Sequence, residues 1–272
     1  MDQLSAIPAW VTGLLTVWLL GGLAVYSYVV RRVGVDGGKV STQEFKEPDL
    51  ILAVALITWI IVNIAGGIGQ PQQDVTQKGI VSTAATYVAI VALLLMFMQF
   101  RGINPLRQFG VARINPFLCI ALGAGLVIAA HPLVVVTEGL TDIAMHGQAK
   151  PQNVVEFFLN ASEKSDFKAV CIMLVLAVIV APMAEETIFR GYLYGVLKRY
   201  IGGIGAGVVS AGLFAALHMN LAALPALFVL ALCLTLAYEA TGSLLVNICM
   251  HGFFNLSMMA LMLYLTGHAN LP

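Results

Sequence analysis

Long apolar stretches alternate with short polar ones along the whole chain. Eight stretches are apolar over most of their length, at about residues 9–30, 50–69, 80–100, 116–137, 168–197, 203–218, 222–239 and 243–266. A helix that crosses the hydrocarbon core of a bilayer needs about 20 mainly apolar residues. These stretches therefore predict about eight transmembrane helices. The fifth is polar toward its far end, so we place its hydrophobic part at 169–184 and expect the helix to continue.

The composition supports a membrane protein. Hydrophobic residues make up 60% of the 272 positions and charged residues only 10%. Soluble domains carry roughly 25% charged residues, so this chain could not supply a polar shell. We predict an all-α, polytopic membrane protein. The formal net charge is zero, so there is no basic excess to indicate a nucleic-acid partner.

Positive charges give the expected topology. The first apolar run has no Lys or Arg before it and is followed by Arg31 and Arg32, which indicates a spanning helix, not a cleaved signal peptide. Loops are numbered here by the predicted helix that each one follows. The first, third and fifth loops (31–49, 101–115 and 198–202) contain nine Lys and Arg, whereas the second and fourth (70–79 and 138–168) contain four. This bias predicts odd loops in the cytoplasm and both termini outside. The short loops and compact length suggest a bacterial plasma membrane.

Six polar side chains fall inside apolar stretches: Glu185, Glu186, Arg190, His218, His251 and Asn255. Residues four apart share a helix face, whereas neighbours diverge by about 100°. Glu186 and Arg190 can therefore form a buried ion pair, which leaves Glu185 without a partner in its own helix.

The same four-residue spacing recurs on two other helices. It joins His251 to Asn255 on the eighth stretch, with Asn247 one turn earlier, and Phe214 to His218 on the sixth. We therefore expect one polar site among the fifth, sixth and eighth helices.

Two interpretations of this site compete. Interhelical hydrogen bonds could simply hold three helices together. A carboxylate and an imidazole that activate water, with donors for an oxyanion, are instead the parts of a hydrolase. Two acids, two histidines and an arginine exceed what helix packing requires, which favours catalysis.

Two further polar residues are placed outside this site. Glu239, at a helix end beside Gly242, is expected at the membrane interface. His131, before Pro132 in the fourth stretch, is expected to cap or line a kink.

Three ordered motifs carry a family resemblance. EETIFR (185–190) matches EExxxR, FAALH (214–218) matches FxxxH, and HGFFN (251–255) matches HxxxN. Together they resemble the CPBP family of membrane proteases, which includes type II CAAX prenyl endopeptidases and Abi proteins linked to bacteriocin self-immunity. The resemblance covers 168–266, the expected catalytic core. Residues 1–167 are then N-terminal transmembrane helices and an interfacial loop of the same bundle, and 267–272 a tail.

The resemblance implies a role for each motif residue. Glu185 would be the base that activates water together with His218, while Glu186, Arg190 and Phe214 would support the site. His251 and Asn255 would stabilise the oxyanion. The implied reaction is hydrolysis of a peptide bond by direct attack of water, and no nucleophile motif such as GxSxG is present. The expected partners are membrane lipid and a peptide or protein substrate, with a lipidated substrate as one option.

The use of a metal is left open by the residues. Glu185, His218 and His251 could supply three ligands to zinc, with water as the fourth. HExxH is absent from the chain, and we favour a metal-free glutamate mechanism with no cofactor. Two other functions stay open: a non-enzymatic immunity or scaffolding protein, and a proton-coupled transporter, which would predict repeat symmetry.

Overall fold

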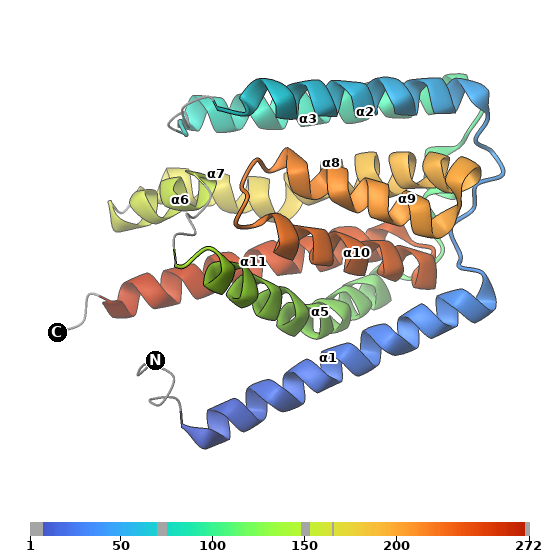
Figure 1. Cartoon of the computed structure of the whole chain (residues 1–272). Coiled ribbons are helices and arrows are strands. Elements are labelled where there is room, and N and C mark those ends of the chain that lie inside the picture. The colour runs from blue at the N-terminus through green and yellow to red at the C-terminus, as the bar shows by residue number, and fades with distance from the viewer. Residues whose placement is uncertain (1–7, 70–74, 148–152, 165, 270–272) are drawn as a thin grey trace.

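The computed structural model describes residues 8–69, 75–147, 153–164 and 166–269 (Figure 1). Every regular element in these residues is helical, which confirms the predicted all-α class. The helices are α1 (Ala9–Asp36), α2 (Glu47–Gly67), α3 (Gln77–Phe100), α4 (Pro105–Gln108), α5 (Pro116–Ala144), α6 (Asn153–Glu163), α7 (Phe167–Val175), η2 (Leu176–Val180), α8 (Ala181–Glu186), η3 (Thr187–Tyr194), α9 (Gly195–Leu217), α10 (Leu224–Thr241) and α11 (Leu244–Ala269), where η marks the wider π-helix.

Within the described residues, seven helical segments are long and apolar enough to cross a membrane. The predicted fifth and sixth helices are two arms of one segment, Phe167–Leu217, which turns back at Gly202 (Figure 1). Gly202 has φ 76° and ψ 167°, a conformation that glycine adopts without steric cost. The returning arm, 203–217, is about 22 Å long at 1.5 Å per residue. It is too short to reach the far side of a bilayer core of roughly 30 Å, and it ends at His218.

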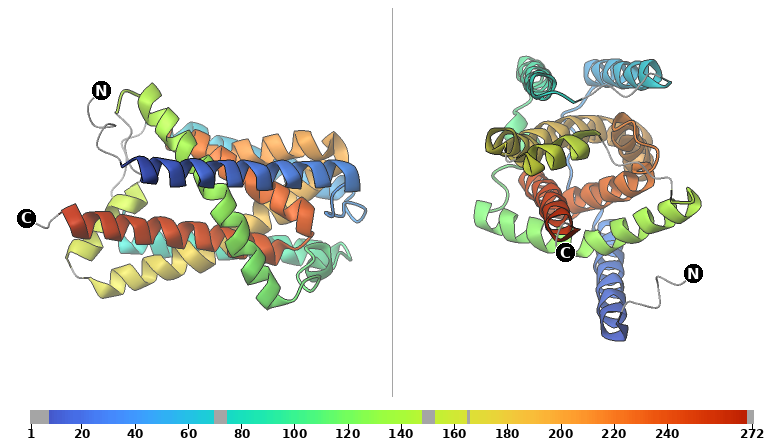
Figure 2. Two further views of the ribbon diagram at one scale, coloured as in Figure 1. Left: turned by 90° about the horizontal axis from the view of Figure 1, so that it is seen from below. Right: turned by 90° about the vertical axis from the view of Figure 1, so that its left-hand side faces the viewer.

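The seven spanning segments form a packed centre with three peripheral members. The centre consists of α5, α10, α11 and the segment from α7 to α9, which contact one another. Helix α1 lies on one side against α5 and α10, while α2 and α3 lie apart from each other on the opposite side (Figure 2). Most residues of α1, α2 and α3 are exposed, as expected for helices whose outer faces contact lipid.

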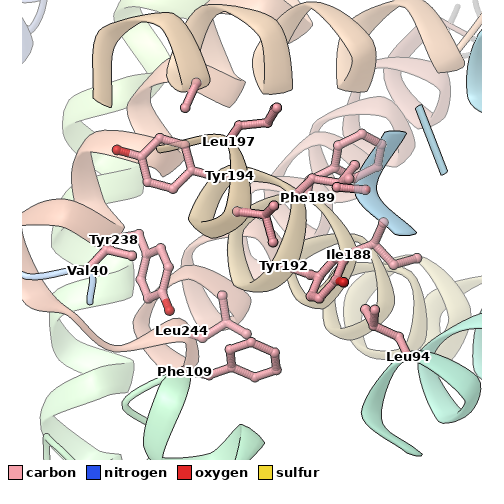
Figure 3. Close-up of a cluster of buried hydrophobic side chains, with 14 of the residues drawn as sticks. Val40, Leu94, Phe109, Ile188, Phe189, Tyr192, Tyr194, Leu197, Tyr238 and Leu244 are labelled. Atoms are coloured by element: carbon pink, nitrogen blue, oxygen red, sulfur yellow. The ribbon is translucent and has the colours of Figure 1, made fainter. Parts of the chain in front are cut away.

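The π-helix η3 lies in the middle of the protein. All eight of its residues are buried, so it is covered on every side. Figure 3 shows Ile188, Phe189 and Tyr192 pointing from it into the largest hydrophobic cluster, which Leu94 of α3 and Leu244 of α11 also enter. Because η3 follows Glu185 and Glu186 directly, the core holds the EExxxR motif at the centre of the bundle.

Helix α1 is held at a proline in α5. Pro132 has no N–H, so it cannot donate to Ile128, four residues earlier. The indole Nε1 of Trp18 donates to this Ile128 carbonyl at 2.8 Å. The neighbouring His131 bonds the Val127 carbonyl through Nδ1 at 2.9 Å and stacks on Trp18. His131 thus lines the proline position, as predicted.

Helix α6 lies in the 138–168 loop, which was predicted as an interfacial loop of the bundle. Its Phe158 is buried in a small cluster with Met173 of α7 and Met259 of α11. The helix therefore packs on the bundle through this side chain.

Candidate functional site

The Glu186 carboxylate is the centre of a buried polar network. Its Oε1 accepts from Arg190 Nη1 at 2.8 Å and from His251 Nδ1 at 2.9 Å, and its Oε2 accepts from Asn247 Nδ2 at 3.3 Å. Glu186 and Arg190 are both 0% exposed. The predicted ion pair is present, and two donors from α11 complete it. A buried charge needs this degree of hydrogen bonding to offset its lost hydration.

Arg190 also has partners beyond the carboxylate. Its Nη2 donates to the Ala231 carbonyl of α10 at 3.2 Å, and its guanidinium lies 4.6 Å from the centre of the Phe214 ring. The face of an aromatic ring attracts a cation, so Phe214 also stabilises the buried charge of Arg190. The EExxxR motif is thereby joined to α9, α10 and α11.

Asn247 belongs to this network. Its Nδ2 donates to the Leu234 carbonyl of α10 at 2.8 Å as well as to Glu186. The sequence placed Asn247 on the stripe of His251 and Asn255, but a role in binding Glu186 was not predicted. Its position four residues before His251 was the available signal.

Glu185 has fewer polar partners than its neighbour. Its Oε2 lies 3.8 Å from His251 Nε2, and its side chain is 11% exposed. Tyr87 of α3 also interacts with this carboxylate. Tyr87 was missed in the sequence because a single tyrosine on an apolar helix is common at lipid-facing positions. Glu185 is thus buried, close to a histidine, and far less completely hydrogen-bonded than Glu186.

His251 connects the two carboxylates. A carboxylate can only accept, so the bond to Glu186 places a proton on Nδ1 and fixes the ring orientation. This leaves Nε2 directed at Glu185.

His218 ends helix α9 at the edge of the site. Its Nδ1 donates to the Phe214 carbonyl at 2.8 Å, so Nε2 is the nitrogen left for a ligand. Its ring and that of His251 both pack against Phe214, at centre distances of 4.9 and 5.8 Å. Within the residues that the structure describes, no hydrogen bond or ion pair joins His218 to Glu185.

Asn255 binds the backbone of another helix. Its Nδ2 donates to the Ala177 carbonyl in η2 at 2.7 Å. Gly252, one turn earlier, lies so close to η2 that an added Cβ would be 2.5 Å from the Val178 carbonyl oxygen. The HGFFN motif therefore brings α11 into direct contact with the η2 backbone.

The three side chains named as possible zinc ligands, Glu185, His218 and His251, do not form a metal site. Over the described part of the chain, no group of three or more His, Cys, Asp or Glu side chains is arranged so that it could hold a metal ion. The arrangement does not fit a three-ligand zinc site, and no step below passes through a metal.

Glu239 lies in a second buried cluster. It is at a helix end before Gly242, as expected, and it is buried, with 4% of the residue exposed. It accepts from Tyr194 Oη, from Lys198 Nζ and from the backbone N–H of Val40. The α1–α2 connection supplies this last donor by folding over the end of α10, which no local pattern reveals.

The family comparison agrees with the motifs. Residues 167–257 match the family model described as "Type II CAAX prenyl endopeptidase Rce1-like". The match contains all three motifs and begins one residue before the expected core, so the predicted resemblance is confirmed over this range. No curated protein and no solved structure matches the chain in the corresponding searches.

Proposed function

We propose that the chain is an intramembrane endopeptidase in which Glu185 activates water. The observation that carries this proposal is the contrast between two adjacent buried glutamates. Glu186 is saturated by Arg190, His251 and Asn247, while Glu185 keeps capacity for a further ligand. The match to the CAAX endopeptidase family supports peptide hydrolysis as the reaction.

Glu185 and His218 would hold the attacking water. Glu185 removes a proton from the water while the water oxygen bonds to the carbonyl carbon of the peptide. His218 Nε2, at the end of α9, orients the same water. The same carboxyl then returns the proton to the amine as the C–N bond breaks. The products are a carboxylic acid and an amine, with no covalent intermediate on the chain.

His251 is suited to stabilise the oxyanion. Two carboxylates flank its ring, Glu186 at Nδ1 and Glu185 near Nε2. Their negative charges would offset the positive charge of a protonated imidazole. In that form Nε2 is a donor fixed within the site. A preorganised donor of this kind stabilises charge that develops on the carbonyl oxygen.

The substrate and topology follow as parts of the proposal. We assign the end that carries loops 31–49, 101–115 and 198–202 to the cytoplasm, since these loops hold most of the Lys and Arg. These loops lie at one end of the bundle, and α1 begins and α11 ends at the other (Figure 1). The proposed substrate is a peptide next to the bilayer, including one with a lipid tail. The proposed setting is a bacterial plasma membrane, and the reaction needs no metal.

The test is cleavage by purified protein. Wild type, Glu185→Gln and the control Glu239→Gln are compared in detergent against a library of unmodified and prenylated peptides, with and without chelator. We expect cleavage by wild type and Glu239→Gln, with or without chelator, and none by Glu185→Gln. Loss with chelator and recovery with zinc would contradict the metal-free step. Absence of cleavage by wild type, or proton-coupled uptake in proteoliposomes that Glu185→Gln abolishes, would contradict the protease.

A further inference from the structure

We propose that Asn255 positions the site by docking α11 on a backbone carbonyl that Pro182 leaves without a donor. The docking would set the distance between His251 and the two glutamates. The catalytic part of this inference rests on the proposed function, whereas the docking itself does not.

The carbonyl of Ala177 has lost both of its usual backbone donors. In the π-helix η2, a carbonyl accepts from the N–H five residues later. The Ala181 N–H, which would bind Ala177 in an α-helix, therefore donates to Leu176. The next donor in this register, for Ala177, would be residue 182. That residue is Pro182, which has no N–H.

Asn255 supplies the missing donor. A carbonyl without a partner is costly in the hydrocarbon region, where no water can replace the bond. Asn255 Nδ2 lies 2.7 Å from the Ala177 oxygen. The proline and the asparagine are thus complementary, although 73 positions separate them in the sequence.

Gly252 allows the close approach that this bond requires. Any side chain at position 252 would meet the Val178 carbonyl, because an ideal Cβ would lie only 2.5 Å from its oxygen. Gly252 is directly adjacent to His251. The contact therefore fixes the backbone that carries the imidazole.

The docking point lies close to the catalytic candidates on both helices. Glu185 and Glu186 follow Pro182 within a single turn, and His251 precedes Asn255 by one turn. Movement of α11 away from η2 would lengthen the 2.9 Å bond to Glu186 and the 3.8 Å approach to Glu185. We therefore assign Asn255 as a positioning residue. The amide hydrogen that binds Ala177 is not directed at an oxyanion.

A double-mutant cycle between Pro182→Ala and Asn255→Ala tests this role. Alanine at 182 restores an N–H that can bind Ala177, so Asn255 should matter less in that background. We expect Asn255→Ala to lower kcat by about 10²-fold in wild type, because an error of about 1 Å at a site can cost that much. In the Pro182→Ala background we expect a loss of less than about threefold, with KM little changed in both.

Thermal unfolding gives a readout that needs no substrate. Asn255→Ala should lower Tm by roughly 3–6 °C in wild type and clearly less with Pro182→Ala. Gly252→Ala should lower both Tm and kcat while Asn255 is intact. Equal effects of Asn255→Ala in both backgrounds would overturn the docking. Coupled Tm values without any cleavage by wild type would instead support the docking and refute the proposed function.

Discussion

Glu186 and Glu239 lie in different parts of the bundle, but each accepts several hydrogen bonds. In this respect both differ from Glu185. Glu186 and Arg190 are 0% exposed and join α8 and η3 to α10 and α11. Glu239 and Lys198, 4% and 17% exposed, join α10 and α9 to the α1–α2 connection. Figure 3 shows Tyr194 and Tyr238 beside Val40 in this second region.

The comparison separates burial from hydrogen-bond saturation. All three glutamates are buried, so burial alone does not mark the reactive one. Glu186 and Glu239 each accept three hydrogen bonds, whereas the polar neighbours of Glu185 are Tyr87 and, at 3.8 Å, His251. A saturated carboxylate stabilises the fold, and a carboxylate with free acceptor capacity can bind and activate water.

After loss of Glu185 itself, the largest effect on turnover is expected at His218, which is proposed to hold the water together with Glu185. His218→Ala should lower kcat by about 10²–10⁴-fold, the range for one acid–base group. Tm should change little, because the half-buried ring bonds only a carbonyl of its own helix. Peptide cleavage and thermal unfolding measure the two quantities. A large loss of Tm would show that His218 stabilises the fold, which would contradict its assignment as a residue that holds water.

Glu186→Ala should produce the largest loss of stability. Removal of this carboxylate leaves Arg190 buried without its counter-ion, which costs about 3–5 kcal/mol in unfolding free energy. Chemical denaturation in detergent measures the change. The control is Glu186→Leu with Arg190→Met, which removes both charges and should recover much of the loss. Wild-type stability of Glu186→Ala would refute the role of the pair.

Glu239→Ala should destabilise less, by about 1–3 kcal/mol. Lys198 keeps 17% exposure and lies near the end of the bundle, so water can partly replace its partner. The same denaturation assay gives the value, and cleavage per folded molecule should be unchanged. A loss larger than that of Glu186→Ala would reverse the expected order of the two networks.

Trp18→Phe should have the smallest effect. It removes one interhelical bond to the Ile128 carbonyl, and such bonds average about 0.6 kcal/mol in membranes. Limited proteolysis of the α1–α2 connection should be faster in the variant than in wild type. A matched control is Trp10→Phe, on the exposed part of α1. Equal proteolysis of the two variants would show that the Pro132 contact does not hold α1.

Local spacing in the sequence predicted part of the site. The four-residue interval was enough to pair Glu186 with Arg190 and to place Asn247, His251 and Asn255 on one stripe. The eight apolar stretches were likewise found, because hydrophobic length depends on composition alone.

Contacts between distant segments could not be predicted in this way. The partners of Glu239 depend on a loop that folds over α10, and Tyr87 depends on how α3 packs on α8. The reversal at Gly202 depends on a single φ angle within a glycine-rich stretch. The bond from Asn255 to Ala177 depends on a π-turn before Pro182, for which the sequence carries no periodic signal.

One measurement tests the central claim most directly: cleavage rate and Tm for the matched set Glu185→Gln, Glu186→Gln and Glu239→Gln. Each variant removes one charge with almost no change in side-chain size. The account predicts that Glu185→Gln loses cleavage and keeps the wild-type Tm, while the other two lower Tm. Retained cleavage by Glu185→Gln, or a loss of Tm as large as that of Glu186→Gln, would contradict the assignment of Glu185 as the reactive carboxylate.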